Sequence, residues 1–292
     1  MHLLSISSLG DSQLDQLFAR AQDYALDPRS GRDRLAGRTI FNCFYENSTR
    51  TAMSFAQAAA RLGAQAITLS VEHSSVKKGE TLADTARTLG AMGPDALVLR
   101  HRQNGAAEEV AALVDCPVVN AGDGTREHPT QALLDALTLR QQFGSLTGRT
   151  IAIIGDIAHS RVAHSNAELL PRLGASVRLA GPPALVPADA GSHSIDEAIA
   201  GADAVMMLRV QRERLDEDLG DAPGEYLRLY GLTPERLALA APGAVVLHPG
   251  PMNRGVEIAD EVADLPGRSL ILRQVANGVA MRMAVLELLI AG

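Results

Sequence analysis

Polar residues gather where the apolar run RTIFNC meets a helix-like segment, in the stretch FYENSTRT. The first turn of a helix carries unpaired N–H groups and a positive partial charge. Three hydroxyl groups and one planar guanidinium would join them there, from Ser48, Thr49, Thr51 and Arg50. Together these donors predict a receptor for phosphate or another oxyanion. The alternative, that Asn47 or Ser48 only caps the helix, accounts for one polar residue and not for four.

A second polar stretch, GDGTREHPTQALLD, leads into another expected helix. Pro129 suits the first helical position, so His128 would precede the helix and Gln131 would follow on the same face. An imidazole N–H and a carboxamide at one helix start suit a small planar amide or carbamoyl group, with His128 polarising a carbonyl oxygen. A histidine that only caps a structural loop is the alternative.

Two arginines stand where strands are expected to end. Arg161 follows the strand RTIAIIGD, and Arg209 ends the segment DAVMMLR, with Gln211 two residues further on. Each guanidinium can hold a carboxylate bidentately, so the pair predicts a dicarboxylate ligand. For either arginine taken alone, a solvated surface side chain is the alternative.

Two further stretches have a structural and a functional interpretation. The loop SSVKKGE contains Ser74, Lys77 and Lys78, and its composition alone favours a solvated basic loop. The turn HPGPMNRG contains Pro249, Gly250 and Pro251. Its prolines expose carbonyls without competing N–H groups, so it is either plain turn chemistry or an acceptor for a substrate NH₂.

The elements that must position these residues alternate between strand and helix. Strands are expected at 38–46, 64–70, 95–100, 117–122, 149–156, 176–182, 203–209 and 243–251. Helices are expected at 12–25, 51–62, 81–93, 106–114, 129–143, 161–174, 194–202, 233–240 and 275–290, with Pro171 kinking or ending its helix.

This alternation predicts the α/β class, with two doubly wound parallel-sheet domains and helices on both faces. The pattern restarts near residues 135–150. We therefore expect a first domain over 1–138, a second over 139–274, and a C-terminal helix within 275–292 that packs back on the first. In such sheets ligands collect at the carboxyl ends of the strands.

The bulk composition excludes several other classes. The 292 residues suit two domains, and 46% hydrophobic residues with no Trp predict an aliphatic core. A net charge of −7 leaves no global basic field for nucleic acid. Cys43 and Cys116 have no metal-ligand spacing and are expected to be buried free thiols. No signal peptide pattern or membrane-spanning apolar run is found, so we expect no membrane association and a cytoplasmic location.

Seven motifs, in order over residues 44–258, resemble those of the catalytic chains of the aspartate carbamoyltransferase family: FYENSTRTAMSF, SSVKKGETLADT, LVLRH, NAGDGTREHPTQALLD, GDIAHSRVAHSN, LRVQRERL and LHPGPMNRGVEI. The resemblance implies a carbamoyl-phosphate domain, an aspartate domain, and a homotrimer with shared active sites, acting without metal or cofactor. The reaction it implies is attack by the α-amine of L-aspartate on carbamoyl phosphate. The products are N-carbamoyl-L-aspartate and phosphate, in de novo pyrimidine biosynthesis.

The same resemblance implies a role for each site residue. The phosphate is held by Ser48, Thr49, Arg50 and Thr51. Carbamoyl phosphate is bound by Arg100, its carbonyl oxygen by His128, its amide by Gln131, and the carbamoyl group by the carbonyl of Gly250 between Pro249 and Pro251. Aspartate is bound by Arg161, Arg209 and Gln211. A neighbouring subunit contributes Ser74, Lys78 and Lys77. The catalytic set is then Arg50, Thr51, Lys78, Arg100, His128 and Gln131.

Three departures from the family pattern are present. Ala52 and His164 stand where arginine is common, and the segment over 182–198 is short. Related ornithine enzymes carry a cysteine in the late turn, where this chain has HPGP, and Arg209 would suit a cationic side chain poorly. The resemblance leaves open a larger assembly with regulatory chains or a dihydroorotase.

Two other functional classes remain as alternatives. A catalytically inactive homologue that serves as an assembly partner would require losses among the motifs, and none is found. A nucleotide-binding oxidoreductase would need the glycine fingerprint G-x-G-x-x-G, which GDIAHSRVAHS lacks.

Overall fold

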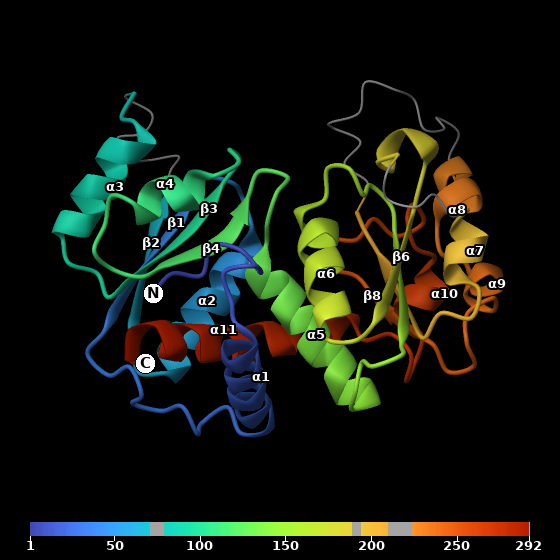
Figure 1. Cartoon of the computed structure of the whole chain (residues 1–292), viewed down its shortest axis with the longest axis horizontal. Coiled ribbons are helices and arrows are strands. Elements are labelled where there is room, and N and C mark those ends of the chain that lie inside the picture. Colours follow the sequence, from blue (N-terminus) through green and yellow to red (C-terminus); the bar gives the residue numbers. More distant parts are fainter. Residues whose placement is uncertain (71–78, 189–193, 210–223, 292) are drawn as a thin grey trace. The chain divides into compact units, whose positions relative to one another are not determined.

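The computed structural model describes residues 1–70, 79–188, 194–209 and 224–291 (Figure 1). The chain divides into two compact units. Unit 1 comprises Met1–Leu137 with Val275–Gly292, and unit 2 comprises Thr138–Gln274. Each unit holds one four-stranded sheet in which all neighbouring strands are parallel.

The sheet of unit 1 has the strand order β2-β1-β3-β4. Its strands are β1 (Thr39–Phe44), β2 (Gln65–Ser70), β3 (Ala96–His101) and β4 (Val118–Asp123). The helices of this unit are α1 (Asp11–Leu26), α2 (Thr49–Arg61), α3 (Leu82–Ala91), α4 (Ala106–Ala111) and most of α11 (Ile271–Ala291). Helices α3 and α4 bury apolar side chains on one face of the sheet, and α2 and α11 lie on the other face (Figure 1). The predicted doubly wound arrangement is therefore confirmed for unit 1.

The sheet of unit 2 has the order β6-β5-β7-β8. Its strands are β5 (Thr150–Ile154), β6 (Ser176–Ala180), β7 (Ala204–Met207) and β8 (Val245–Leu247). Around them are α6 (Arg161–Arg172), η3 (Pro183–Leu185), α7 (Ile195–Ile199), α8 (Glu225–Tyr230), α9 (Pro234–Leu237) and α10 (Asp260–Ala263). Helix α5 (Pro129–Phe143) crosses the sequence boundary between the two units. The core of unit 2 is aliphatic, as the composition predicts.

Local signals account for several helix starts, and the sequence predicted the one at Pro129. Helix α5 begins at Pro129, and the side chains of Thr81 and Thr233 accept capping hydrogen bonds from Asp84 and Arg236. Other bounds differ. Helix α2 begins at Thr49, two residues before the expected start, and α11 begins at Ile271 instead of at residue 275. Pro171 lies in the last turn of α6, which ends one residue later.

Helix α11 is the one helix in the described part of the chain with the length and hydropathy of a membrane span. However, 61% of the qualifying window is buried within the fold. Arg282 and Gln274 on this helix are also buried and hydrogen-bonded. These are the properties of a core helix, because buried polar groups need partners inside the protein.

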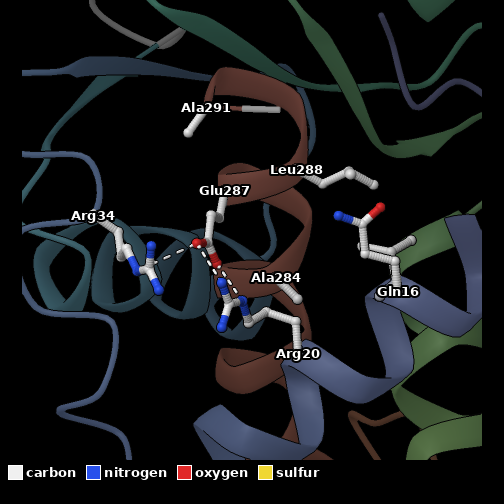
Figure 2. A pocket seen from close by; sticks show the side chains of 8 residues that line it. Gln16, Arg20, Arg34, Ala284, Glu287, Leu288 and Ala291 are labelled. Carbon is white, nitrogen blue, oxygen red and sulfur yellow. Dashed lines mark hydrogen bonds and ion pairs between the residues drawn. The ribbon is translucent and has the colours of Figure 1, made fainter.

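A charged cluster fastens α11 to α1 beside a cavity of about 290 Å³ (Figure 2). Glu287 lies 3.0 Å from Arg20 Nε and 3.5 Å from Arg34 Nε. The hydroxyl of the buried Tyr24 donates to the same carboxylate. Burial, and then Glu287, raise the pKa of Tyr24 well above its usual value, so the phenol stays protonated as a donor. The cluster contains none of the predicted site residues. Its contacts indicate a structural role, which is to hold α11 against α1.

We predict that Glu287→Ala lowers the free energy of unfolding by about 2 kcal/mol, since it leaves a buried phenol and two guanidinium groups without their shared acceptor. The matched control is Asp23→Ala, whose carboxylate is 64% exposed and lies 4.0 Å from the same Arg20. Exposed pairs of this kind contribute less than about 1 kcal/mol. Urea unfolding measures both variants. Equal losses of unfolding free energy in the two variants would show that the Glu287 cluster contributes no more to stability than an exposed ion pair.

Candidate active site

The predicted site residues of unit 1 follow three strands whose carboxyl ends meet at one edge of the sheet. The chain runs from β1 outward to β2 and then returns to place β3 on the other side of β1. The strand order therefore reverses between β1 and β3. In open parallel sheets such a switch point leaves a crevice for ligands between the two loops that diverge there. Ser48 to Thr51 follow β1, and Arg100 lies at the end of β3.

The stretch after β1 forms the first turn of α2. Ser48 is the N-cap residue, but its side chain makes no capping hydrogen bond. Thr49 and Arg50 are exposed, whereas Thr51 is buried. The interpretation of Ser48 as a simple side-chain cap is thus wrong. The hydroxyl groups and the guanidinium belong to the N-cap and first turn of this helix, where an oxyanion would be favoured.

Arg100 joins the ends of three strands. Its Nη1 donates to the carbonyl of Ala121 in β4 at 3.2 Å, and its Nε lies 3.5 Å from the carboxylate of Glu46. Only 13% of the Arg100 side chain is exposed. Its own backbone carbonyl accepts from the Tyr45 N–H at 2.8 Å. The guanidinium is therefore held at the edge where the switch point lies.

His128 and Gln131 lie at the start of α5, after β4. The carbonyl of His128 accepts from the N–H groups of Gln131 and Ala132, which places His128 at the helix cap. The two side chains are only 4% and 8% exposed. Gln131 Nε2 donates to Asp135 Oδ1 at 2.9 Å. An imidazole and a carboxamide thus stand together at this helix start, as the spacing predicts.

The loop between β4 and α5 depends on a buried carboxylate that the sequence interpretation did not include. Asp123 Oδ1 accepts from Asn120 Nδ2 at 2.9 Å and from the Glu127 N–H at 3.1 Å. Its other oxygen accepts from the Gly105 N–H at 2.8 Å. Each carboxylate oxygen can accept more than one such bond. Asp123 therefore fixes the path of the loop that delivers His128.

Unit 2 repeats the arrangement, with a switch point between β5 and β7. Arg161 is the first residue of α6 after β5, and Arg209 follows β7. Between the strand ends, Gly155 has φ +136°, and a Cβ there would come within 3.0 Å of the Leu208 side chain. Glycine is needed at this approach of two backbones. Both arginines accordingly stand at the edge where a ligand of this unit is expected.

The turn after β8 is held by a buried histidine. His248 Nδ1 accepts from the Gly250 N–H at 2.9 Å, so its Nε2 carries the proton and faces Glu257 Oε1 at 3.2 Å. Glu257 also accepts from the Asn253 N–H. Both side chains are fully buried. These contacts fix the turn from Pro249 to Pro251, which contains a cis Gly250–Pro251 peptide.

The structure thus brings two sets together, one in each unit. Unit 1 brings Ser48, Thr49, Arg50, Thr51, Arg100, His128 and Gln131 to one sheet edge. Unit 2 brings Arg161, Arg209, Pro249, Gly250 and Pro251 to another. Four predicted residues, Ser74, Lys77, Lys78 and Gln211, lie outside the described residues. Within the described ranges, no group of three or more His, Cys, Asp or Glu side chains could hold a metal ion.

Comparison with known proteins gives matches over nearly the whole chain. Residues 1–141 match the profile of the aspartate/ornithine carbamoyltransferase carbamoyl-P binding domain, and residues 147–289 match that of the Asp/Orn binding domain. Aspartate carbamoyltransferase catalytic subunits from Granulibacter bethesdensis and Gluconacetobacter diazotrophicus are 56% and 54% identical, each over 99% of this chain and over 94% and 92% of their own lengths.

Solved structures give the same two-unit match. Aspartate transcarbamoylase from Trypanosoma cruzi, in complex with carbamoyl aspartate and phosphate, is 34% identical with a TM-score of 0.84, covering 98% of this chain and 94% of that one. Ornithine carbamoyltransferase from Pyrococcus furiosus is 27% identical with a TM-score of 0.88, covering 100% and 97%.

Proposed function

The chain belongs to the aspartate/ornithine carbamoyltransferase family, and we propose that it carbamoylates L-aspartate. It is a carbamoyltransferase that moves the carbamoyl group of carbamoyl phosphate to the α-amine of aspartate. The products are N-carbamoyl-L-aspartate and phosphate, in de novo pyrimidine biosynthesis. The observation that carries this conclusion is the 56% identity, over 99% of the chain, to a protein named aspartate carbamoyltransferase catalytic subunit.

The choice of aspartate over ornithine is supported by the second unit. Arg161 and Arg209 stand at its switch point, where two guanidinium groups suit the two carboxylates of aspartate. Ornithine would bring a cationic side chain toward them, and like charges would repel. The late turn also has no cysteine, which the related ornithine enzymes carry.

The proposed mechanism needs no covalent enzyme intermediate. The α-amine forms a C–N bond to the carbonyl carbon, and the carbonyl oxygen takes up negative charge. The C–O bond to phosphate then breaks, and phosphate leaves with the electron pair and accepts the amine proton. The residues around Arg50 hold the phosphate, His128 donates to the oxyanion, and the Gly250 carbonyl accepts from the carbamoyl NH₂. Orientation and electrostatic stabilisation supply the rate.

We also propose that three copies share their active sites, with Ser74, Lys77 and Lys78 entering from a neighbour. The relatives are named catalytic subunits. In unit 1, β2 is an edge strand of the sheet. The exposed apolar side chains include Met53 on α2, Ile67 on β2 and Met92 at the end of α3. An interface that covers these side chains and the sheet edge would remove both from water.

His128→Ala should lower kcat by about a hundredfold to a thousandfold, since it removes a donor to the transition-state oxyanion. Binding of carbamoyl phosphate should weaken far less, because the phosphate contacts around Arg50 remain. Steady-state kinetics with both substrates measure the effect, and isothermal titration with carbamoyl phosphate is the control. An unchanged kcat would remove His128 from the mechanism.

Arg209→Ala should raise the KM for aspartate steeply while carbamoyl phosphate affinity stays near its normal value. The loss of a paired charge corresponds to roughly 2–5 kcal/mol of binding. The matched control in the same unit is Arg228→Ala, whose side chain is 71% exposed and whose pairing to Glu225 is a surface contact of 3.9 Å. If the affinities for aspartate and for carbamoyl phosphate fall by the same factor, Arg209 has been assigned to the wrong binding site.

The shared site predicts that two inactive variants rescue each other. Arg50→Ala trimers lack the guanidinium that is proposed to bind the phosphate. Lys78→Ala trimers lack the lysine that each subunit is proposed to contribute to the site of its neighbour. Mixed cyclic trimers contain one interface with both residues intact. Random reassembly of equal amounts makes about three-quarters of the trimers mixed, each with one native site, so activity should recover to about a quarter of wild type.

Dissociation and reassembly are first verified with wild-type subunits, whose activity must return. Particle size by light scattering confirms the trimer in each sample. A mixture as inactive as its parents would show that each site is built within one chain, and the interface proposal would fall.

A further inference from the structure

A buried arginine on α11 lies behind the carbamoyl side of the site. Only 3% of Arg282 is exposed. Its Nη2 lies 3.4 Å from Thr130 Oγ1, its Nη1 donates to the Gly278 carbonyl at 3.2 Å, and its guanidinium carbon lies 5.0 Å from the centroid of the Phe55 ring. Burial lowers the pKa of Arg282 to about 10, against an opposing effect of Asp135. The side chain thus remains cationic at neutral pH.

The helix makes room for this guanidinium. A Cβ at Gly278 would come within 2.7 Å of Arg282 Nη1 and 3.3 Å of a Leu134 methyl carbon. Glycine inside a helix costs about 1 kcal/mol relative to alanine. A buried charge also costs free energy that an aliphatic side chain of similar volume would avoid. A contribution to stability alone is therefore a poor explanation for Arg282.

The partners of Arg282 belong to the two helices that begin at the phosphate and carbamoyl residues. Phe55 lies on α2, one turn after Thr51, and Thr130 lies in the first turn of α5, next to Gln131. Asp135 is fully buried one turn further along α5 and accepts from Gln131 Nε2. The charge of Arg282 is thus placed among groups that adjoin the site and not at the site itself.

This placement sets the direction of the Gln131 amide. Gln131 Nε2 donates to Asp135 Oδ1 at 2.9 Å, and a carboxylate oxygen is a hydrogen-bond acceptor. The end of Gln131 that faces Asp135 must then be its NH₂ group. A carboxamide that donates through its NH₂ group to Asp135 keeps its carbonyl oxygen, Oε1, as the acceptor suited to the NH₂ of a carbamoyl group.

We propose that Asp135 and Arg282 are positioning residues that fix Gln131 with its carbonyl oxygen toward the carbamoyl amide. The proposal rests on the proposed function, which supplies the carbamoyl ligand. It concerns residues that touch no substrate and act only through Gln131. Asp135→Asn would keep the shape of the side chain but could present either a donor or an acceptor to Gln131, so the Gln131 amide could rotate by 180°.

The test is a double-mutant cycle with carbamoyl phosphate and inorganic phosphate as the two titrated ligands. Asp135→Asn should weaken carbamoyl phosphate binding about tenfold, the scale of one hydrogen bond, and leave inorganic phosphate binding unchanged. In a Gln131→Ala background the same substitution should have no further effect on carbamoyl phosphate, because the residue it acts through is gone. Arg282→Met should show the same pattern and provides a second cycle if Asp135→Asn unfolds.

The matched control is Asp95→Asn, another carboxylate of unit 1, which accepts from Arg38 Nη1 and the Thr39 N–H, each at 2.8 Å. Asp95→Asn should lower the melting temperature without changing the affinity for carbamoyl phosphate or for inorganic phosphate. The proposal would be overturned if Asp135→Asn still weakened carbamoyl phosphate binding tenfold in the Gln131→Ala background. It would also be overturned if Asp135→Asn weakened the binding of inorganic phosphate by the same factor. Wild-type turnover with aspartate is measured first, so that failure of the proposed function is seen separately.

Discussion

All the strand pairings in the two described sheets are parallel, and this constraint determines where polar groups can gather. A parallel strand must be followed by a crossover, so every strand points the same way and all carboxyl ends share one edge. Reversal of strand order beside β1 and beside β5 then opens a gap between two diverging loops in each unit. Ser48 to Thr51, Arg161 and Arg209 follow the strands that border those gaps, where the topology favours a ligand.

The chain has a net charge of −7, yet both cationic and anionic groups are held at these sheet edges by specific contacts. Arg100 is paired with Glu46, and Asp123 is surrounded by three N–H donors. The fully buried His248–Glu257 pair holds the late turn. Each contact leaves a buried polar group with a partner, which a low-dielectric interior requires. The same contacts prevent the loops from relaxing, so donors and acceptors stay where a ligand would meet them.

The sequence was most informative where a feature is local. Pro129 predicted the start of α5, because the preference of proline for a helix start concerns only the first turn. It misjudged the end of the segment that contains Arg209, since β7 ends at Met207 and the pattern of apolar residues continues past the last strand bond. His248 and Glu257 stood inside a recognised motif, yet their support of the turn depends on its folded path.

The burial of Asp135 and Arg282 could not be predicted from local sequence patterns. They are far apart in the chain, and on their helices each would be expected to be a solvated charge. Only the packing of α11 against α2 and α5 makes them buried neighbours of the site. Gly278 carried the one sequence signal, a glycine within a helix, which often marks a close approach.

The position of α11 in the chain gives these contacts their significance. Its first turn belongs to unit 2, where Gln274 Oε1 accepts from the His248 N–H at 2.9 Å. Its later turns belong to unit 1, where Arg282 adjoins Thr130 and Glu287 fastens α1. One continuous helix therefore carries a residue that supports the late turn in unit 2 and another that contacts the first turn of α5 in unit 1. Because a helix fixes the spacing of its own side chains, the support of the late turn and the contacts of Arg282 depend on the same element of secondary structure.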